Sequence, residues 1–379
     1  MTTLRDHFLL DPGIIYLNHG SFGATPKPVF EEYQRWQLEL ERGPVEFLGR
    51  RHDELMHVAR AALGKYLGTD ARNLVYVQNV TIALNIVARS LDLGAGDEVL
   101  TTNHEYGAMD RTWRFLSKER GFNYKIQKVD LTSHEEFIES FWLGVTEHTR
   151  VIFMSHITSP TATIFPVEEI IRRAKEKGII TVIDGAHTAG QLSLDLDALG
   201  ADFYGGNLHK WLCAPKGAGF LYANSEMQHL LKPLVVSWGY ESEKPSGSEF
   251  IDHHEWWGTR DVAAFLSVPA AIDFQSLHGW DDVRKSCHRL AVDTWNRIIS
   301  LTGLDPLHND DGRFAQMVVT PLPSAVDLQV IKNKLFDEYH IEIPVVEWDG
   351  RKWLRLSIQG YNSQSDANAL VFALEQILK

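Results

Sequence analysis

The chain lacks the features that mark several large classes of protein. Its 379 residues include only two cysteines, Cys213 and Cys287, too few for a disulfide framework or a thiolate metal site. No apolar run reaches the length of a membrane span, and the N-terminus has no secretion-signal pattern. Acidic residues outnumber basic ones, giving a formal net charge of -13, so we expect no nucleic-acid or membrane partner. These absences predict a cytoplasmic protein.

The sequence also lacks the short motifs and repeats that identify many ligand-binding folds. It contains neither a Walker-type loop nor a G-x-G-x-x-G dinucleotide fingerprint, and no internal repeat or low-complexity segment. What is present is the composition of a globular protein, with 44% apolar and 23% charged residues. Because single cores stop growing at about 250 to 300 residues, we expect two domains.

Short apolar runs alternate with helical patterns along the first two thirds of the chain. The runs are rich in β-branched and aromatic residues, and between them apolar residues recur at helical spacing, as in 81–91 and 167–177. This βαβ rhythm predicts an α/β fold with a mostly parallel sheet covered by helices. The expected strands are 74–77, 98–102, 124–129, 150–155, 179–184, 202–205 and 219–222.

The two ends of the chain depart from this rhythm. After Pro26, apolar residues at helical spacing predict an amphipathic helix. From about Asp281 a long helix is expected, followed by strands at 313–319 and 353–358 that flank a helix at 326–339. The predicted parts are an N-terminal arm and helix that pack with the small domain (1–40), a large domain (41–280) and a small α+β C-terminal domain (281–379).

Two charged residues follow strand-like runs in positions that favour one kind of chemistry. Asp184 ends an apolar run, and Lys210 lies downstream in Asn-Leu-His-Lys-Trp. Pyridoxal 5'-phosphate (PLP) needs a lysine amine to hold its aldehyde and a carboxylate to keep its pyridine nitrogen protonated. A capping aspartate and a solvated lysine are the alternatives for each residue alone. With His187 close by, the pattern predicts a PLP site with Lys210, Asp184 and His187 as its catalytic residues.

A phosphate group needs hydrogen-bond donors, and a strand-to-helix junction can supply them. Val80 and Thr81 lie at such a junction, where backbone N–H groups, the helix dipole and a hydroxyl come together. The alternative is that Thr81 only caps the helix. Asn207 and His209, next to the lysine, are further candidate donors. Because ligands of parallel sheets bind beyond the carboxyl ends of the strands, we expect these residues near Lys210.

The whole chain resembles a fold-type-I PLP enzyme of the class V aminotransferase family and, within it, the isopenicillin N epimerase-like branch. The resemblance rests on nine elements in one order, among them Asp184-Gly-Ala-His, Asn207-Leu-His-Lys and Trp257-Gly-Thr-Arg. It implies a three-layer α/β fold of the PLP-transferase type with a smaller α+β C-terminal domain. The elements are residues 17–23, 43–48, 78–81, 104–108, 158–161, 184–187, 207–210, 257–261 and 355–357.

The resemblance also implies roles for single residues toward the cofactor. Lys210 would form the internal aldimine, a Schiff base, while Asp184 would pair with the pyridine nitrogen and Tyr106 would stack on the ring. Ser159 and His187 would contact the phenolic oxygen. One phosphate contact would come from a neighbouring subunit, which implies a homodimer with shared active sites. The implied phosphate contacts are Val80, Thr81, Asn207, His209 and, from that subunit, Thr259.

Substrate contacts are implied as well. Arg355 lies where relatives clamp the α-carboxylate of an amino acid or small peptide, and a guanidinium fork suits that planar anion. An ordinary surface salt bridge is the alternative. His19 is expected to line the substrate entrance. Cysteine desulfurases of this family carry a nucleophilic cysteine shortly before the clamp arginine, but residues 338–352 contain none, so a persulfide mechanism is disfavoured and Cys213 is expected only to pack.

The implied reaction begins with removal of a Cα proton by Lys210. Returning a proton to the opposite face gives epimerisation, the leading prediction, which needs a second donor; His19, His104 and Tyr106 are the candidates. Expelling a Cβ substituent would make the enzyme a C–S lyase acting on a sulfur-substituted amino acid, and protonating the cofactor would make it an aminotransferase. A non-catalytic scaffold and a nucleotide-binding α/β enzyme are the alternatives from other classes.

Overall fold

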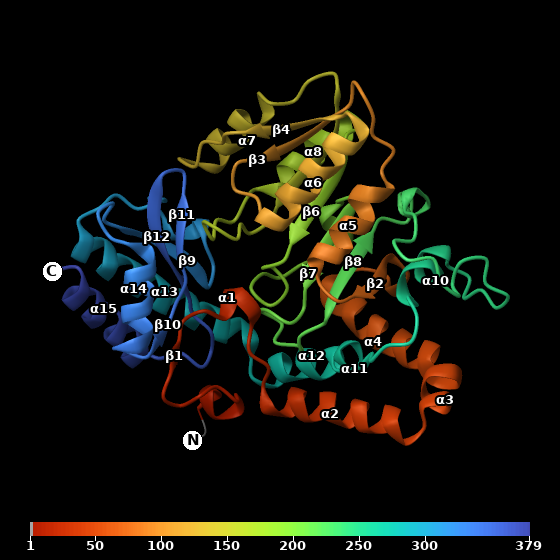
Figure 1. Cartoon of the computed structure of the whole chain (residues 1–379), viewed down its shortest axis with the longest axis horizontal. Helices are drawn as coiled ribbons and strands as arrows, with labels where there is room; N and C mark the ends of the chain where they lie inside the picture. The colour runs from red at the N-terminus through yellow and green to blue at the C-terminus, as the bar shows by residue number, and fades with distance from the viewer. Residues whose placement is uncertain (1–2) are drawn as a thin grey trace.

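A seven-stranded sheet forms the centre of the computed structural model, which describes residues 3–379 (Figure 1). The strand order is β2-β8-β7-β6-β5-β3-β4, and only β8 runs opposite to the other six. The expected mostly parallel sheet is therefore confirmed. Its strands are β2 (Leu74–Val77), β3 (Glu98–Thr102), β4 (Asn123–Gln127), β5 (Thr149–Ser155), β6 (Ile180–Gly185), β7 (Phe203–Asn207) and β8 (Gly219–Ala223).

Helices cover both faces of this sheet. Successive residues of a strand point to opposite sides, so strands that are apolar throughout place apolar side chains on both faces. In β5, Val151 and Phe153 join the core on one face, while Ile152 and Met154 join the core on the other. Two apolar layers on one sheet are what a mostly parallel α/β fold requires. One face packs against α5 (Val80–Ser90), α6 (Gly107–Arg120) and α10 (Glu249–Glu255), and the other against α4 (His52–Leu67), α7 (His134–Trp142), α8 (Val167–Glu176), α11 (Ala263–Leu266) and α12 (Val268–Leu277).

The C-terminal part of the chain builds a smaller α+β unit around its own core, as the sequence predicts. An antiparallel sheet with the order β11-β12-β9 packs against three helices, drawn in teal and blue in Figure 1. No helix among the described residues is both long and apolar enough to cross a bilayer. The elements are α13 (Trp280–Thr302), β9 (Met317–Leu322), α14 (Leu328–Asp337), β11 (Val345–Trp348), β12 (Arg351–Ser357) and α15 (Gln364–Ile377).

The N-terminal arm joins the smaller unit, but the helix after it does not. Strand β1 (Ile15–Tyr16) pairs with β10 (Ile341–Glu342), and α1 (His19–Phe22) follows. Helix α2 (Lys27–Arg42), which confirms the amphipathic helix expected after Pro26, lies against α11 and α12. The expectation that this helix packs with the small domain is corrected, because its apolar side faces the core of the large sheet. The boundaries at residues 40 and 280 stay a prediction.

Candidate active site

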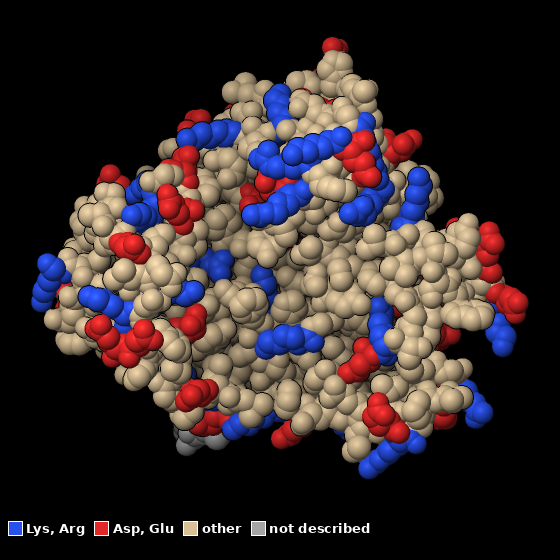
Figure 2. Space-filling view, viewed as in Figure 1, with Lys and Arg blue, Asp and Glu red and all other residues tan. Residues whose placement is uncertain are grey.

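A pocket of about 240 Å³ lies at the carboxyl edge of the central sheet. The ends of β5, β6 and β7 and the start of α5 contribute to it. Figure 2 shows basic atoms in the recess between the two parts of the molecule on this face. Nine of the twelve candidate residues line the pocket together, all except Arg355, His19 and Thr259. The lining residues are Ser21, Phe22, Asn79, Val80, Thr81, Tyr106, Ser155, Ile157, Ser159, Asp184, Ala186, His187, Asn207, His209 and Lys210.

Lys210 reaches the pocket from the turn that connects β7 to β8. Burial lowers the pKa of its amine from 10.5 to about 7; nearby Arg355 adds to this effect, while Asp184 opposes it. The amine therefore has a large unprotonated fraction at neutral pH, as a nucleophile or base requires. Its Nζ lies 3.2 Å from His187 Nε2.

The backbone around Lys210 is tightly fitted to the N-terminal arm. Gly23 has a φ of +71°, and a Cβ at this position would lie 2.0 Å from the carbonyl oxygen of His209. Only glycine combines this conformation with so close an approach. The Leu17–Gly23 element of the sequence thus has a physical reason, which is to seat the lysine turn.

Asp184 stands at the end of β6 with one carboxylate oxygen free for a ligand. Its Oδ1 accepts a hydrogen bond from the N–H of Ala186 at 2.9 Å, while its buried Oδ2 has no partner among residues 3–379. Burial raises the pKa of Asp184 to about 6, and the Ala186 N–H and Lys210 oppose this rise. A cation placed at Oδ2 would satisfy the buried oxygen and favour the charged carboxylate.

Hydrogen-bond donors lie together at the N-terminus of α5, and one of the expected donors already has a partner in the protein. Asn207 Oδ1 accepts the backbone N–H of Val80 at 2.9 Å. Val80 itself lines the pocket, but its N–H is engaged by Asn207, whose Nδ2 is left to donate, so the role of Val80 toward the phosphate stays a prediction. Thr81 lines the pocket beside it. His209 Nδ1 lies 3.2 Å from the carbonyl of Ala218, which orients that ring.

Arg355 lies in the wall of the pocket rather than in its lining. Its guanidinium donates to the carbonyl and hydroxyl of Ser159 and to the hydroxyl of Ser21, and both serines line the pocket. Burial lowers the pKa of Arg355 to about 10, so the side chain stays cationic at neutral pH. No carboxylate within residues 3–379 forms a salt bridge with it. A buried cation held only by neutral groups is suited to binding an anion from solution.

His19 does not line the pocket, and the prediction that it lines the substrate entrance is corrected. Its side chain is fully buried, with Nδ1 2.9 Å from the Tyr361 hydroxyl and Nε2 2.9 Å from the carbonyl of Lys210. Burial lowers the pKa of His19 to about 3, so the ring is neutral. It therefore supports the backbone of Lys210 from behind.

Tyr106 and Thr259 differ in their relation to the pocket. Tyr106 directly precedes α6, lines the pocket and is 43% exposed, so its ring is accessible to a ligand. Thr259 lies outside the pocket of its own chain, in the exposed loop after α10. This residue is thus open to contact from another molecule.

Glu105 and Ser155 belong to the site although no sequence motif assigned them roles. Ser155 pairs with Asp184 between β5 and β6, and Glu105 Oε2 accepts from the Ser155 N–H at 2.9 Å and from its hydroxyl at 2.6 Å. Burial raises the pKa of Glu105 to about 8 despite the hydrogen bonds from Ser155 and Thr102, and Asp184 adds to the rise. The sequence feature that could have indicated Ser155 is its position at the end of a predicted strand, next to the strand that ends at Asp184.

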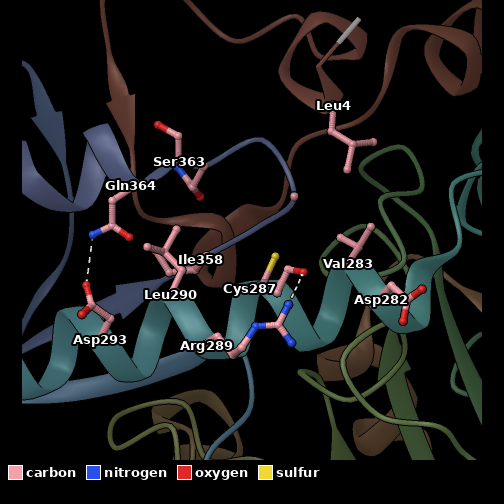
Figure 3. A pocket seen from close by; sticks show the side chains of 13 residues that line it. Leu4, Asp282, Val283, Cys287, Arg289, Leu290, Asp293, Ile358, Ser363 and Gln364 are labelled. Carbon is pink, nitrogen blue, oxygen red and sulfur yellow. Dashed lines mark hydrogen bonds between the residues drawn. The ribbon is translucent and has the colours of Figure 1, made fainter. Parts of the chain in front are cut away.

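A larger hollow of about 720 Å³ lies between α13 and the start of α15, but it offers no comparable chemistry. Figure 3 shows Cys287 pointing into it; burial raises the pKa of this thiol to about 12, which makes it a poor nucleophile. Its charged groups are engaged, since Arg289 donates to Ser286 and Asp293 accepts from Gln364. Within residues 3–379, no group of three or more His, Cys, Asp or Glu side chains is arranged to bind a metal.

Comparisons with known proteins agree with this geometry. A model of the family described as aminotransferase class-V matches residues 15–370. The chain is 34% identical to an isopenicillin N epimerase of Amycolatopsis lactamdurans, over 99% of this chain and 98% of the relative. It is 27% identical to a probable chloroplastic L-cysteine desulfhydrase of Arabidopsis thaliana, over 97% and 84%. A solved mutant of C-DES with glycine linked to its PLP cofactor has the same fold, with a TM-score of 0.87, 22% identity and 99% coverage of both chains.

Proposed function

The chain belongs to the class V aminotransferase family of PLP-dependent enzymes, and we propose that it acts at Cα of an amino acid or small peptide as an isopenicillin N epimerase-like enzyme. The observation that carries the proposal is that Lys210 and Asp184 line one pocket while Arg355, held in its wall by two lining serines, has no compensating charge among the described residues. Family membership also sets aside the scaffold and nucleotide-binding alternatives.

The residues of the pocket fit PLP. The unpartnered Oδ2 of Asp184 suits a protonated pyridine nitrogen, and Lys210 supplies an amine with a lowered pKa. Asn207, Thr81 and the N-terminus of α5 supply donors for a phosphate. When bound, PLP provides an electrophilic aldehyde and an electron-withdrawing ring that acidifies the Cα–H bond of an attached amino acid.

Arg355 and Lys210 act on different parts of the substrate. Arg355 holds the substrate carboxylate through its guanidinium, which Ser21 and Ser159 keep in place. With the carboxylate fixed, Lys210 Nζ removes the Cα proton, because its pKa of about 7 leaves much of the amine free to accept one.

Epimerisation needs a proton donor on the face opposite Lys210. Of the three candidates, His104 is buried and its Nδ1 contacts Thr161, and His19 supports the backbone of Lys210. Tyr106 alone of the three lines the pocket. We therefore assign it the role of second donor. Tyr106→Phe should suppress epimerisation more than it suppresses exchange of the Cα proton.

A C–S lyase is the second candidate function, and a specific likeness favours it. The alignment with the relative named as a probable L-cysteine desulfhydrase spans 97% of this chain, and the loss of sulfide from cysteine requires cleavage of the Cβ–S bond. Both reactions begin with the same proton removal by Lys210. They differ in the next bond to change, which is a new Cα–H bond in epimerisation and the Cβ–S bond in the lyase.

The deciding experiment combines an absorption spectrum with substrate tests in heavy water. The purified enzyme should be yellow, and a panel of amino acids, thioether amino acids and aminoacyl tripeptides should include one that exchanges Cα–H for deuterium without fragmenting. Release of pyruvate, ammonia or a sulfur compound would replace epimerisation by lyase activity. A protein that cannot take up PLP would refute both.

We further propose that the active form is a cytoplasmic homodimer in which Thr259 of each chain completes the other chain's phosphate site. The exposed position of Thr259 supports this, and so do the exposed residues Phe22, Val45 and Trp238, which are 70%, 76% and 84% accessible. Mixing inactive Lys210→Ala chains with Thr259→Val chains should restore one intact site per hybrid dimer. Absence of any recovered activity in verified hybrids would contradict sharing.

A further inference from the structure

Trp211, the residue after the lysine, forms a chain of contacts with His187 and Lys210. The indole Nε1–H of Trp211 donates to His187 Nδ1 at 3.2 Å, and His187 Nε2 lies 3.2 Å from Lys210 Nζ. Trp211 is fully buried and His187 is 1% exposed, so water does not compete for the contact between these two rings.

The hydrogen bond from Trp211 determines which nitrogen of His187 carries the proton. An indole nitrogen can only donate, so His187 Nδ1 must carry a lone pair and cannot carry a proton. The ring is therefore neutral with its proton on Nε2, which points toward Lys210 and the pocket. Burial of the ring holds the pKa of His187 well below its ordinary value, and the nearby Lys210, Arg355, His209 and His19 add to this effect.

We propose that Trp211 is a positioning residue that locks His187 in its Nε2–H tautomer, so that the pocket is presented with a donor and Lys210 with a partner for its free amine. This inference deepens the proposed function and rests on it for the meaning of the donor. A protonated Lys210 has no lone pair to accept a hydrogen bond from His187 Nε2–H. This tautomer of His187 therefore favours the neutral amine of Lys210.

Trp211 is held firmly enough to act as such a lock. Its carbonyl accepts from Gln275 Nε2 at 2.9 Å, and its ring packs against His19 with centroids 4.9 Å apart. Gly190, with a φ of +99°, lies against its backbone; a Cβ there would lie 2.2 Å from the Trp211 carbonyl. The backbone of Trp211 is thereby fixed, and the contact with His19 and the hydrogen bond to His187 hold its ring.

The first measurement is nitrogen NMR of the holoenzyme with isotopically labelled histidine, using His187→Gln to assign the resonance. Wild-type His187 should carry its proton on Nε2. Finding it on Nδ1, or on both nitrogens, would overturn the inference without any Trp211 variant. Trp211→Phe should move the tautomer ratio toward Nδ1–H by about fivefold or more, the effect of one lost hydrogen bond.

Trp113→Phe is the matched control, because Trp113 is also fully buried but its indole N–H has no hydrogen-bond partner among the described residues. A second readout is the pH titration of the cofactor absorbance. Trp211→Phe should raise its midpoint by roughly one pH unit, since a weaker donor stabilises the phenolic anion less. Unchanged tautomer and midpoint would refute the lock, whereas a wild-type protein without PLP would refute only the proposed function.

Discussion

Replacing Lys210 by methionine should make the cofactor-free protein more stable below about pH 9, although it removes the proposed base. Burial lowers the pKa of Lys210 from 10.5 in its ordinary state to about 7 in the folded protein. Between these values the unfolded chain binds a proton that the folded chain does not, so wild-type stability rises with pH in this window. The penalty is complete below about pH 7 and gone above about pH 10.5.

The structure sets the size of this effect. The difference between the two pKa values corresponds to about 5 kcal/mol of unfolding free energy. Methionine removes that cost but leaves the Nε2–H of His187 without its acceptor, which costs about 2 kcal/mol. The variant should therefore be about 3 kcal/mol more stable near pH 6 and about 2 kcal/mol less stable above pH 10.5, with equal stability near pH 9.

Urea unfolding of both cofactor-free proteins at one protein concentration, from about pH 6 to pH 10, measures this crossing. Lys118→Met, an exposed change on α6, serves as control and should give a difference that does not vary with pH. If the Lys210→Met and wild-type curves run parallel, the amine is not desolvated in the folded state and the argument for a base with a lowered pKa fails.

Three further predictions concern other parts of the site. Asp184→Asn should still bind PLP but slow Cα deuterium exchange by at least about 100-fold, because an amide cannot stabilise the ring cation; an unchanged rate excludes this role. Arg355→Lys should raise KM for carboxylate substrates about tenfold or more with a smaller effect on kcat, as steady-state kinetics will show. Gly23→Ala should cost about 2 kcal/mol or more in thermal unfolding, because its Cβ would meet the His209 carbonyl.

Much of the central fold could be predicted because its signals are local. Each strand is a short apolar run and each helix a periodic one, so β2, α5 and β6 fall within a few residues of their expected bounds. The reversed direction of β8 could not be read in this way. Nor could the pairing of β1 with β10, because it joins two-residue strands more than 300 residues apart.

The site shows the same division between local and distant information. Asp184 and Asn207 were predictable because they end strands, and all parallel strands end at one edge. The error at His19 came from assuming that a residue in a shared motif faces the ligand. Its ring is instead buried against Tyr361, a contact with a segment far away in sequence.

The reversed direction of β8 has a consequence for how Lys210 is held. The turn that carries the lysine begins at Asn207 and ends at Gly219, and these residues pair directly in adjacent strands. Both ends of the turn are thus fixed to the rigid sheet, and the N–H groups of Leu208 and His209 bond back to Ala218. The entropy of placing the amine is lost during folding rather than at each encounter with substrate. The amide hydrogens of Leu208 and His209 should therefore exchange with solvent as slowly as those of the central sheet.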